Sequence, residues 1–183
     1  MSTYPGTTIE VLDLKKGSSK ILFDGIFAAG GITLSQLSTM TGLEPYIIQN
    51  WVKRKFVTSP VKKLYSKQQF ARIVIINMLR ETLQIDAICN LISVIGGDIE
   101  DTTDDLIGDD ELYHRYVDMI AEENIDISNE NSVNDIVKKA TENFEARTTG
   151  DKIKIERILK VMLYAHIASK LRDKAKEVLA QLD

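Results

Sequence analysis

The sequence predicts a mainly α-helical fold, in which a small basic head is followed by an all-helical C-terminal region with a long last helix. Residues 32–95 hold four stretches whose apolar residues recur at helical spacing, with a short basic turn in the middle. Residues 151–182 contain neither glycine nor proline. An apolar content of 44% is enough to fill a core across these helices.

The head begins with a pair of short helices. Thr33 is a suitable cap for a helix over residues 34–40, and Gly42 supplies the left-handed conformation that ends it. Pro45 suits the first turn of a second helix, where its missing N–H is not needed. This second helix should turn Ile48 and Trp51 inward, so that the pair forms a helix-turn-helix.

The outward face of the second helix is rich in polar and basic side chains. In a helix that enters the major groove, asparagine and glutamine suit adenine, while lysine and arginine suit guanine or phosphate. An ordinary solvated helix face is the alternative interpretation. The candidate DNA-contacting residues are Tyr46, Gln49, Asn50, Lys53 and Arg54.

A small basic hairpin, or wing, is predicted over residues 57–65. We expect a strand at residues 56–57, a turn at residues 58–60 and a returning strand at residues 61–65. Such a wing lies along a phosphate backbone, and lysines and a tyrosine hydroxyl are good phosphate donors. The candidate wing contacts are Lys62, Lys63 and Tyr65.

Two further helices complete the head. Ser66 followed by Gln69 is a capping box that opens a helix over residues 67–79. Because this helix is apolar on most sides, it should be largely buried. A second helix, over residues 85–95, should end at the glycine pair 96–97.

This order of elements resembles the DNA-binding head of MerR-type regulators, and the string GLEPYIIQNWVKRKFV more closely resembles a bacterial family known as domain of unknown function 1836. The resemblance spans roughly residues 30–121. It implies a winged helix-turn-helix head with the second helix and the wing on DNA. Two departures stand out: the wing is shorter than in typical MerR proteins, and Lys55 occupies a position where those proteins often have glycine.

Charge is distributed unevenly along the chain. The net charge is −4, yet residues 32–80 hold eight lysine and arginine residues against a single acidic residue, Glu44. Residues 81–150 hold 18 acidic residues against four basic ones. A basic patch attracts phosphate whatever the total charge, so the acidic part should face away from DNA.

Three regions are expected: an N-terminal arm at 1–31, the head at 32–97, and an acidic linker with a helical tail at 98–183. The arm should include one strand or turn and a short helix from residue 21, packed under the head or against a partner subunit. Residues 98–105 read as a solvated linker. Tail helices are expected at 109–121, 132–146 and 151–182, with Asp109 or Asp110 as the first cap. His114 is expected at the surface and His166 as a satisfied structural histidine.

The last helix carries two apolar patterns. Seven residues form a heptad seam that suits a homodimer: Val161, Tyr164, Ala168, Leu171, Ala175, Val178 and Leu182. Other apolar residues broaden the surface, as in the core of a small helical domain: Ile155, Ile158, Leu159, Met162, Ala165 and Ile167. Dimerisation and intramolecular packing both remain open, and one helix could do both. The tail aromatics are interpreted as core filling rather than as an effector pocket.

These observations favour a sequence-specific transcriptional regulator that binds double-stranded DNA, as a homodimer on a palindromic site. The alternatives are a protein–protein adaptor and an architectural DNA-binding protein, although the large tail disfavours the latter. No nucleophile–base pair, phosphate-cradling loop or metal cluster is apparent, so we expect no enzyme and no cofactor. A single cysteine, Cys89, excludes a disulfide framework. Without a signal or membrane-spanning stretch, a cytoplasmic protein is expected.

Overall fold

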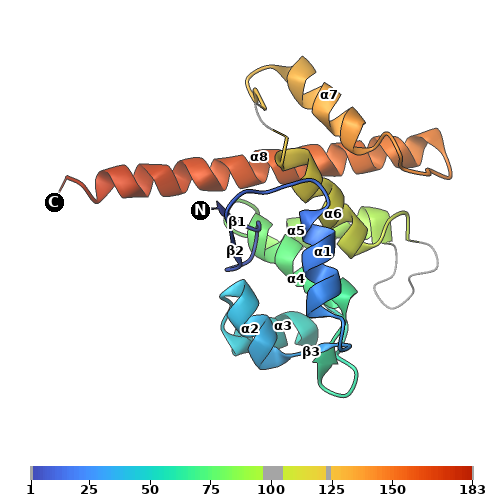
Figure 1. Cartoon of the computed structure of the whole chain (residues 1–183), viewed down its shortest axis with the longest axis vertical. Coiled ribbons are helices and arrows are strands. Elements are labelled where there is room, and N and C mark those ends of the chain that lie inside the picture. The colour runs from blue at the N-terminus through green and yellow to red at the C-terminus, as the bar shows by residue number, and fades with distance from the viewer. Residues whose placement is uncertain (1, 97–104, 123–124, 183) are drawn as a thin grey trace.

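The computed structural model describes residues 2–96, 105–122 and 125–182. Within them the chain is mainly helical, and the head and the last two helices lie at opposite ends of the molecule (Figure 1). The elements are β1 (Ser2–Thr3), β2 (Glu10–Val11), α1 (Ser18–Ile26), β3 (Ile32–Thr33), α2 (Leu34–Thr41), α3 (Pro45–Lys53), β4 (Leu64–Tyr65), α4 (Lys67–Leu79), α5 (Ile85–Gly96), α6 (Asp109–Ile120), α7 (Glu130–Ala140) and α8 (Thr149–Leu179).

Helix α4 is the centre of the fold. It packs against α2, α5, α6 and α8, and nine of its 13 residues are buried. This confirms the prediction of a largely buried helix. Its start is also as predicted, because the Ser66 side chain accepts from the Gln69 N–H and the Gln69 side chain accepts from the Ser66 N–H. The helices of the head and those of the tail therefore share one hydrophobic core.

The N-terminal segment packs against the rest of the same chain through a few buried side chains, among them Tyr4 and Phe23. Strands β1 and β2 form an antiparallel pair, with Ser2 opposite Val11. Helix α1 contacts α6, and the fully buried ring of Phe23 lies 4.9 Å from that of Phe70 and 5.3 Å from that of Tyr113, measured between centroids. Of the two placements expected for this helix, the structure shows packing within the chain.

Helices α2 and α3 confirm the predicted pair. Thr33 caps α2 through a capping box with Gln36, and Gly42 ends it with a φ of 69°. Pro45 is the first residue of α3, where its fixed φ suits the helix and its missing N–H costs no hydrogen bond.

The wing differs from the prediction. Residues 56–57 form no strand, and β4 pairs instead with β3, with Ile32 opposite Tyr65. The Phe56 N–H is already bonded to the Trp51 carbonyl, 2.9 Å away, and Pro60 has no N–H to offer a ladder. The chain reverses at residues 62–63 rather than 58–60, inside the bridge between Val61 and Leu64.

Tail helices occur where they were expected, with shifted ends. Helix α7 is capped by Asn129 and ends at Ala140, not near residue 146. Its C-cap is the buried Thr141, whose hydroxyl bonds back to the carbonyls of Val137 and Lys138 at 3.1 Å. Helix α6 has Gly108 rather than an aspartate at its N-cap. The expectations for Gly97 and for most of the acidic linker concern residues outside those described.

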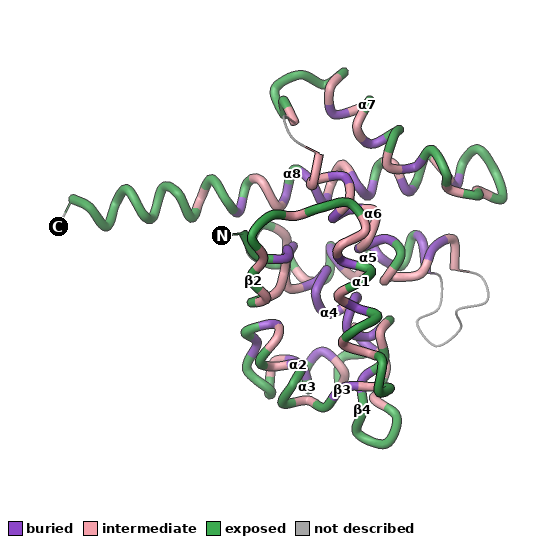
Figure 2. Tube along the Cα trace, in the orientation of Figure 1, coloured by how far each residue is buried: buried purple, intermediate pink, exposed green. Residues whose placement is uncertain are grey.

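Helix α8 has two different faces. Its core-facing side chains are buried, among them Ile155, Leu159 and Met162. The predicted heptad seam lies on the other side of the helix, and residues 173–182 are exposed all round, as Figure 2 shows for the projecting end. The broad apolar pattern thus fills the core, while the seam is left uncovered.

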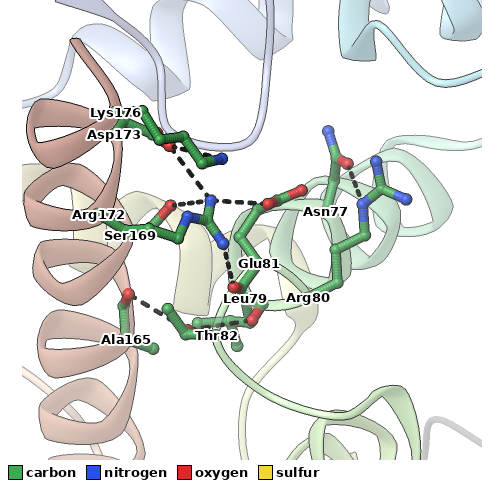
Figure 3. Close-up of polar contacts among 10 residues, drawn as sticks. All are labelled: Asn77, Leu79, Arg80, Glu81, Thr82, Ala165, Ser169, Arg172, Asp173 and Lys176. Carbon is green, nitrogen blue, oxygen red and sulfur yellow. Dashed lines mark hydrogen bonds and ion pairs between the residues drawn. The ribbon is translucent and has the colours of Figure 1, made fainter. Parts of the chain in front are cut away.

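The tail is fastened to the connection between α4 and α5. Arg172 donates to the side chain of Glu81 at 2.7 Å and to its carbonyl oxygen, while the Thr82 hydroxyl donates to the Ala165 carbonyl at 3.3 Å (Figure 3). The free part of α8 begins directly after this contact.

The two histidines occupy different environments. His166 is satisfied as predicted, because the Tyr116 hydroxyl lies 2.5 Å from its Nδ1. His114 is not a plain surface residue: its Nδ1 lies 2.9 Å from the hydroxyl of the buried Ser19, and its ring meets Phe23 edge-on. The helical pattern of α6 alone could not reveal α1 as its covering partner.

Candidate nucleic-acid interface

Helix α3 presents a polar face to solvent. Its inner side is fixed by Ile48, which is fully buried, and by Trp51, which is 4% exposed. On the opposite side Tyr46 is 68% exposed. The predicted contact residues Gln49, Asn50 and Lys53 are also exposed. The structure therefore brings these four predicted residues together on one accessible surface.

Arg54 lies at the edge of this surface. Its guanidinium is 3.3 Å from the Asp86 carboxylate at the start of α5, and it also sits over the Phe56 ring at 4.3 Å. Both partners of the ion pair are largely exposed, so the pair is screened and exchanges readily with water. Arg54 thus lies beside the other candidate residues but is directed partly toward α5.

The exit from α3 is a Schellman turn. The Lys55 N–H bonds to the Val52 carbonyl at 3.0 Å and the Phe56 N–H to the Trp51 carbonyl at 2.9 Å. This pattern requires a left-handed residue between Arg54 and Phe56, a place usually taken by glycine. Lys55 fills it with a φ of 60°. The resemblance to MerR heads left this exit open, and the structure shows that lysine adopts the glycine conformation.

The tip of the wing is a two-residue turn made of Lys62 and Lys63. The N–H and carbonyl groups of Val61 and Leu64 exchange two hydrogen bonds, at 3.1 and 2.9 Å. The two lysines between them have φ values of 51° and 65°, the pattern of a type I′ turn. Both side chains are exposed, as predicted for the wing.

Gln69 holds the first half of the wing against α4, a role that sequence reasoning missed. Its side-chain Nε2 donates to the Thr58 carbonyl and hydroxyl, both at 2.9 Å, and to the Ser59 carbonyl at 3.0 Å. Its Oε1 accepts from the Ser66 N–H at 2.8 Å. The capping-box pattern identified the last of these bonds only, since the others cross a turn whose shape the sequence does not encode locally.

Tyr65 does not belong to the accessible surface. It is 3% exposed and pairs with Ile32 in the β3–β4 ladder, and burial raises the pKa of its hydroxyl. Alternation along an extended segment left its direction open, because the partner strand lies more than 30 residues earlier. The expectation that its hydroxyl contacts phosphate is therefore withdrawn.

The resulting surface combines hydrogen-bonding groups suited to bases with cations suited to phosphate. It lies on the part of the head turned away from α7 and α8, so no tail helix covers α3 (Figure 1). Among the described residues there is no cluster of histidine, cysteine or acidic side chains that could hold a metal ion. In the same part of the chain, no helix is long and apolar enough to cross a membrane.

Comparison with known proteins finds a family model that matches the head. Residues 31–116 match the family model described as Domain of unknown function (DUF1836). No curated protein and no solved structure matches the chain. The matched residues run from just before β3 into the middle of α6, so they include the whole candidate interface and the buried helix α4 beneath it. The comparison therefore supports the resemblance of this chain to the family of domain of unknown function 1836.

Proposed function

We propose that the protein is a sequence-specific DNA-binding transcriptional regulator that acts as a homodimer on a palindromic site. Helix α3 enters the major groove with Tyr46, Gln49 and Asn50 toward the bases. Lys53 and the wing lysines contact the phosphate backbone, which sets the register of the helix.

The observation that carries this proposal is the joint exposure of two elements. The polar side of α3 and the lysine turn of the wing both face solvent, while the apolar sides of the same elements are packed into the core. A helix-turn-helix needs this arrangement, because the groove-facing side chains must be free while the backbone beneath them is held rigid.

The charge distribution gives independent support. The head is basic and residues 81–150 are acidic, which orients the protein toward phosphate through the head. An adaptor that binds an acidic protein would use the same charges, so DNA binding itself has to be measured.

A second copy of this chain is the proposed occupant of the uncovered face of α8. Leu171 is 61% exposed, Val178 52% and Leu182 78%, and they follow one another at the heptad spacing of a coiled-coil seam. A two-fold dimer would also place two heads on the half-sites of a palindrome.

The direct test is the selection of binding sites from random duplexes, followed by titration of purified variants on the selected and on unrelated duplexes. Replacing Gln49 or Asn50 by alanine should lower the preference for the selected site by about 1–3 kcal/mol for each lost bidentate contact. Lys62→Ala should instead weaken binding to every duplex and flatten its salt dependence.

Asp135→Ala, on an exposed position of α7, is the matched surface control and should leave both readouts unchanged. Equal losses on all duplexes from the base-facing and the wing variants would contradict the proposed division of roles. If the wild-type protein binds no bare duplex at physiological salt, the regulator is excluded and the adaptor takes its place.

A further inference from the structure

In the described part of the chain, positive φ values outside glycine occur at lysines of the head. Among the described residues, the non-glycine positions with positive φ are Lys55, Lys62 and Lys63. One ends the proposed recognition helix and the other two make the tip of the wing. No other type of side chain adopts this conformation in the described part of the chain.

Lysine is an unfavourable choice at these positions. A Cβ atom crowds the backbone in the left-handed region, so glycine is the usual residue there and asparagine the best substitute. A Schellman turn favours glycine at the place of Lys55, and a type I′ turn favours Asn-Gly at the places of Lys62 and Lys63. The sequence thus departs from the favoured residue three times, each time toward a positive charge.

The ammonium groups of these three lysines are free to bind a ligand. Each of these lysines is exposed, and none has an ion pair or side-chain hydrogen bond with another described residue. Elsewhere on the head, Arg54 and Lys67 are engaged by Asp86, Asp24 and Asp110. Backbone strain that persists at unpaired charges is the pattern expected where the charge has a role outside the folded chain.

We infer that Lys55 is a further phosphate-binding residue, and that it acts together with Lys62 and Lys63 as one set of backbone contacts on either side of the groove-inserted helix. This inference rests on the proposed DNA-binding function and adds to it a residue and a physical reason. The protein gives up stability at three backbone positions in two turns, and in exchange it places three cations where they meet DNA phosphates.

The test measures thermal stability and DNA affinity, which should change in opposite directions when Lys55 is replaced. Lys55→Asn relieves the strain, so the Tm of the full-length protein should rise by about 2 °C. The same change removes one phosphate contact, so affinity near 0.2 M salt should fall about threefold on every duplex, and the slope of log K against log salt should shrink by about one. Lys55→Arg keeps the charge and the strain, and should retain both wild-type values.

The wing provides the second variant. Lys62→Asn combined with Lys63→Gly installs the favoured turn, so Tm should rise further while the salt slope shrinks by about two. The matched control is Lys138→Asn on α7, an exposed lysine inside a helix. This change should leave the affinity unaltered and should not raise Tm.

The outcomes separate the inference from the function on which it rests. If Lys55→Asn stabilises the protein while affinity and salt slope stay at wild-type values, Lys55 is not a phosphate contact and the inference is overturned, although the regulator survives. If Tm falls instead, the strain argument is wrong. If the wild-type protein binds no duplex, the proposed function itself fails, and the inference with it.

Discussion

Tyr116 and His166 form a polar pair within the tail core, and this pair makes stability depend on pH. Burial lowers the pKa of His166 to about 4, while that of an unfolded histidine is about 6.5. Burial also lowers the pKa of His114. Between pH 4 and pH 6.5, His166 is therefore protonated in more of the unfolded molecules than of the folded ones. Stability is therefore complete above about pH 6.5 and declines as the pH falls toward 4.

We predict that acidification from pH 7.5 to 5 costs about 2 kcal/mol through His166 alone. His166→Gln removes this titration while keeping an acceptor for the Tyr116 hydroxyl, so its urea-unfolding free energy should fall less over the same range. The difference between wild type and variant isolates this histidine from the carboxylates. An identical pH slope in both proteins would show that His166 does not titrate as described.

For single residues, the sequence predicts which side chains of α3 face outward, because helical spacing alone separates the exposed positions from the buried ones. It does not predict Tyr65, whose direction depends on a strand far away in the chain. Nor does it predict the conformation of Lys55, since a lysine in a glycine position looks like an exception until the backbone is seen.

Single elements are predicted best where their signals are local. The capping boxes at Thr33 and Ser66 and the proline at the start of α3 lie within four residues of the helix ends that they define. The wing has no such signal. Its strand pairs with β3, its tip is a lysine pair rather than Asn-Gly, and its first half is held by a side chain of α4.

We predict that Gln69→Leu lowers the free energy of unfolding by about 1–3 kcal/mol, because the partly buried carbonyl groups of Thr58 and Ser59 lose their shared donor. The wing should also loosen, so affinity for all duplexes should fall while base preference is retained. Asn90→Leu is the control, on an exposed position of α5 whose side chain makes no hydrogen bond with another described residue. Hydrogen exchange at residues 58–65 reports the loosening, and unchanged exchange would show that Gln69 does not hold the wing.

Across the whole molecule, α8 was predicted as one long helix with two apolar patterns, and the structure assigns the broad one to the core. We predict that Leu171→Glu with Val178→Glu converts a dimer into a folded monomer, because both side chains are exposed within one chain and only the contact between chains is lost. Sedimentation equilibrium measures the change, and binding to a full palindrome should weaken far more than binding to a half-site.

The matched control is Lys176→Glu, which changes charge on the same helix at an exposed position on the side away from the seam. This variant should keep the molar mass that sedimentation equilibrium gives for the wild-type protein. A wild-type protein that sediments as a monomer at micromolar concentration would contradict this assembly.

The central position of α4 has a practical consequence for any attempt to isolate residues 32–96 as a separate domain. Fully buried residues such as Ile73, Ile75 and Ile76 leave this helix no solvent-facing side in that stretch, and α6 and α8 supply part of the cover. A fragment that ends at residue 96 would expose the apolar surface of α4 that α6 and α8 normally cover, and it should aggregate. Point substitutions are therefore best studied in the full-length chain. A fusion of this head to an unrelated tail would require a redesign of the surface that α4 buries against α6 and α8.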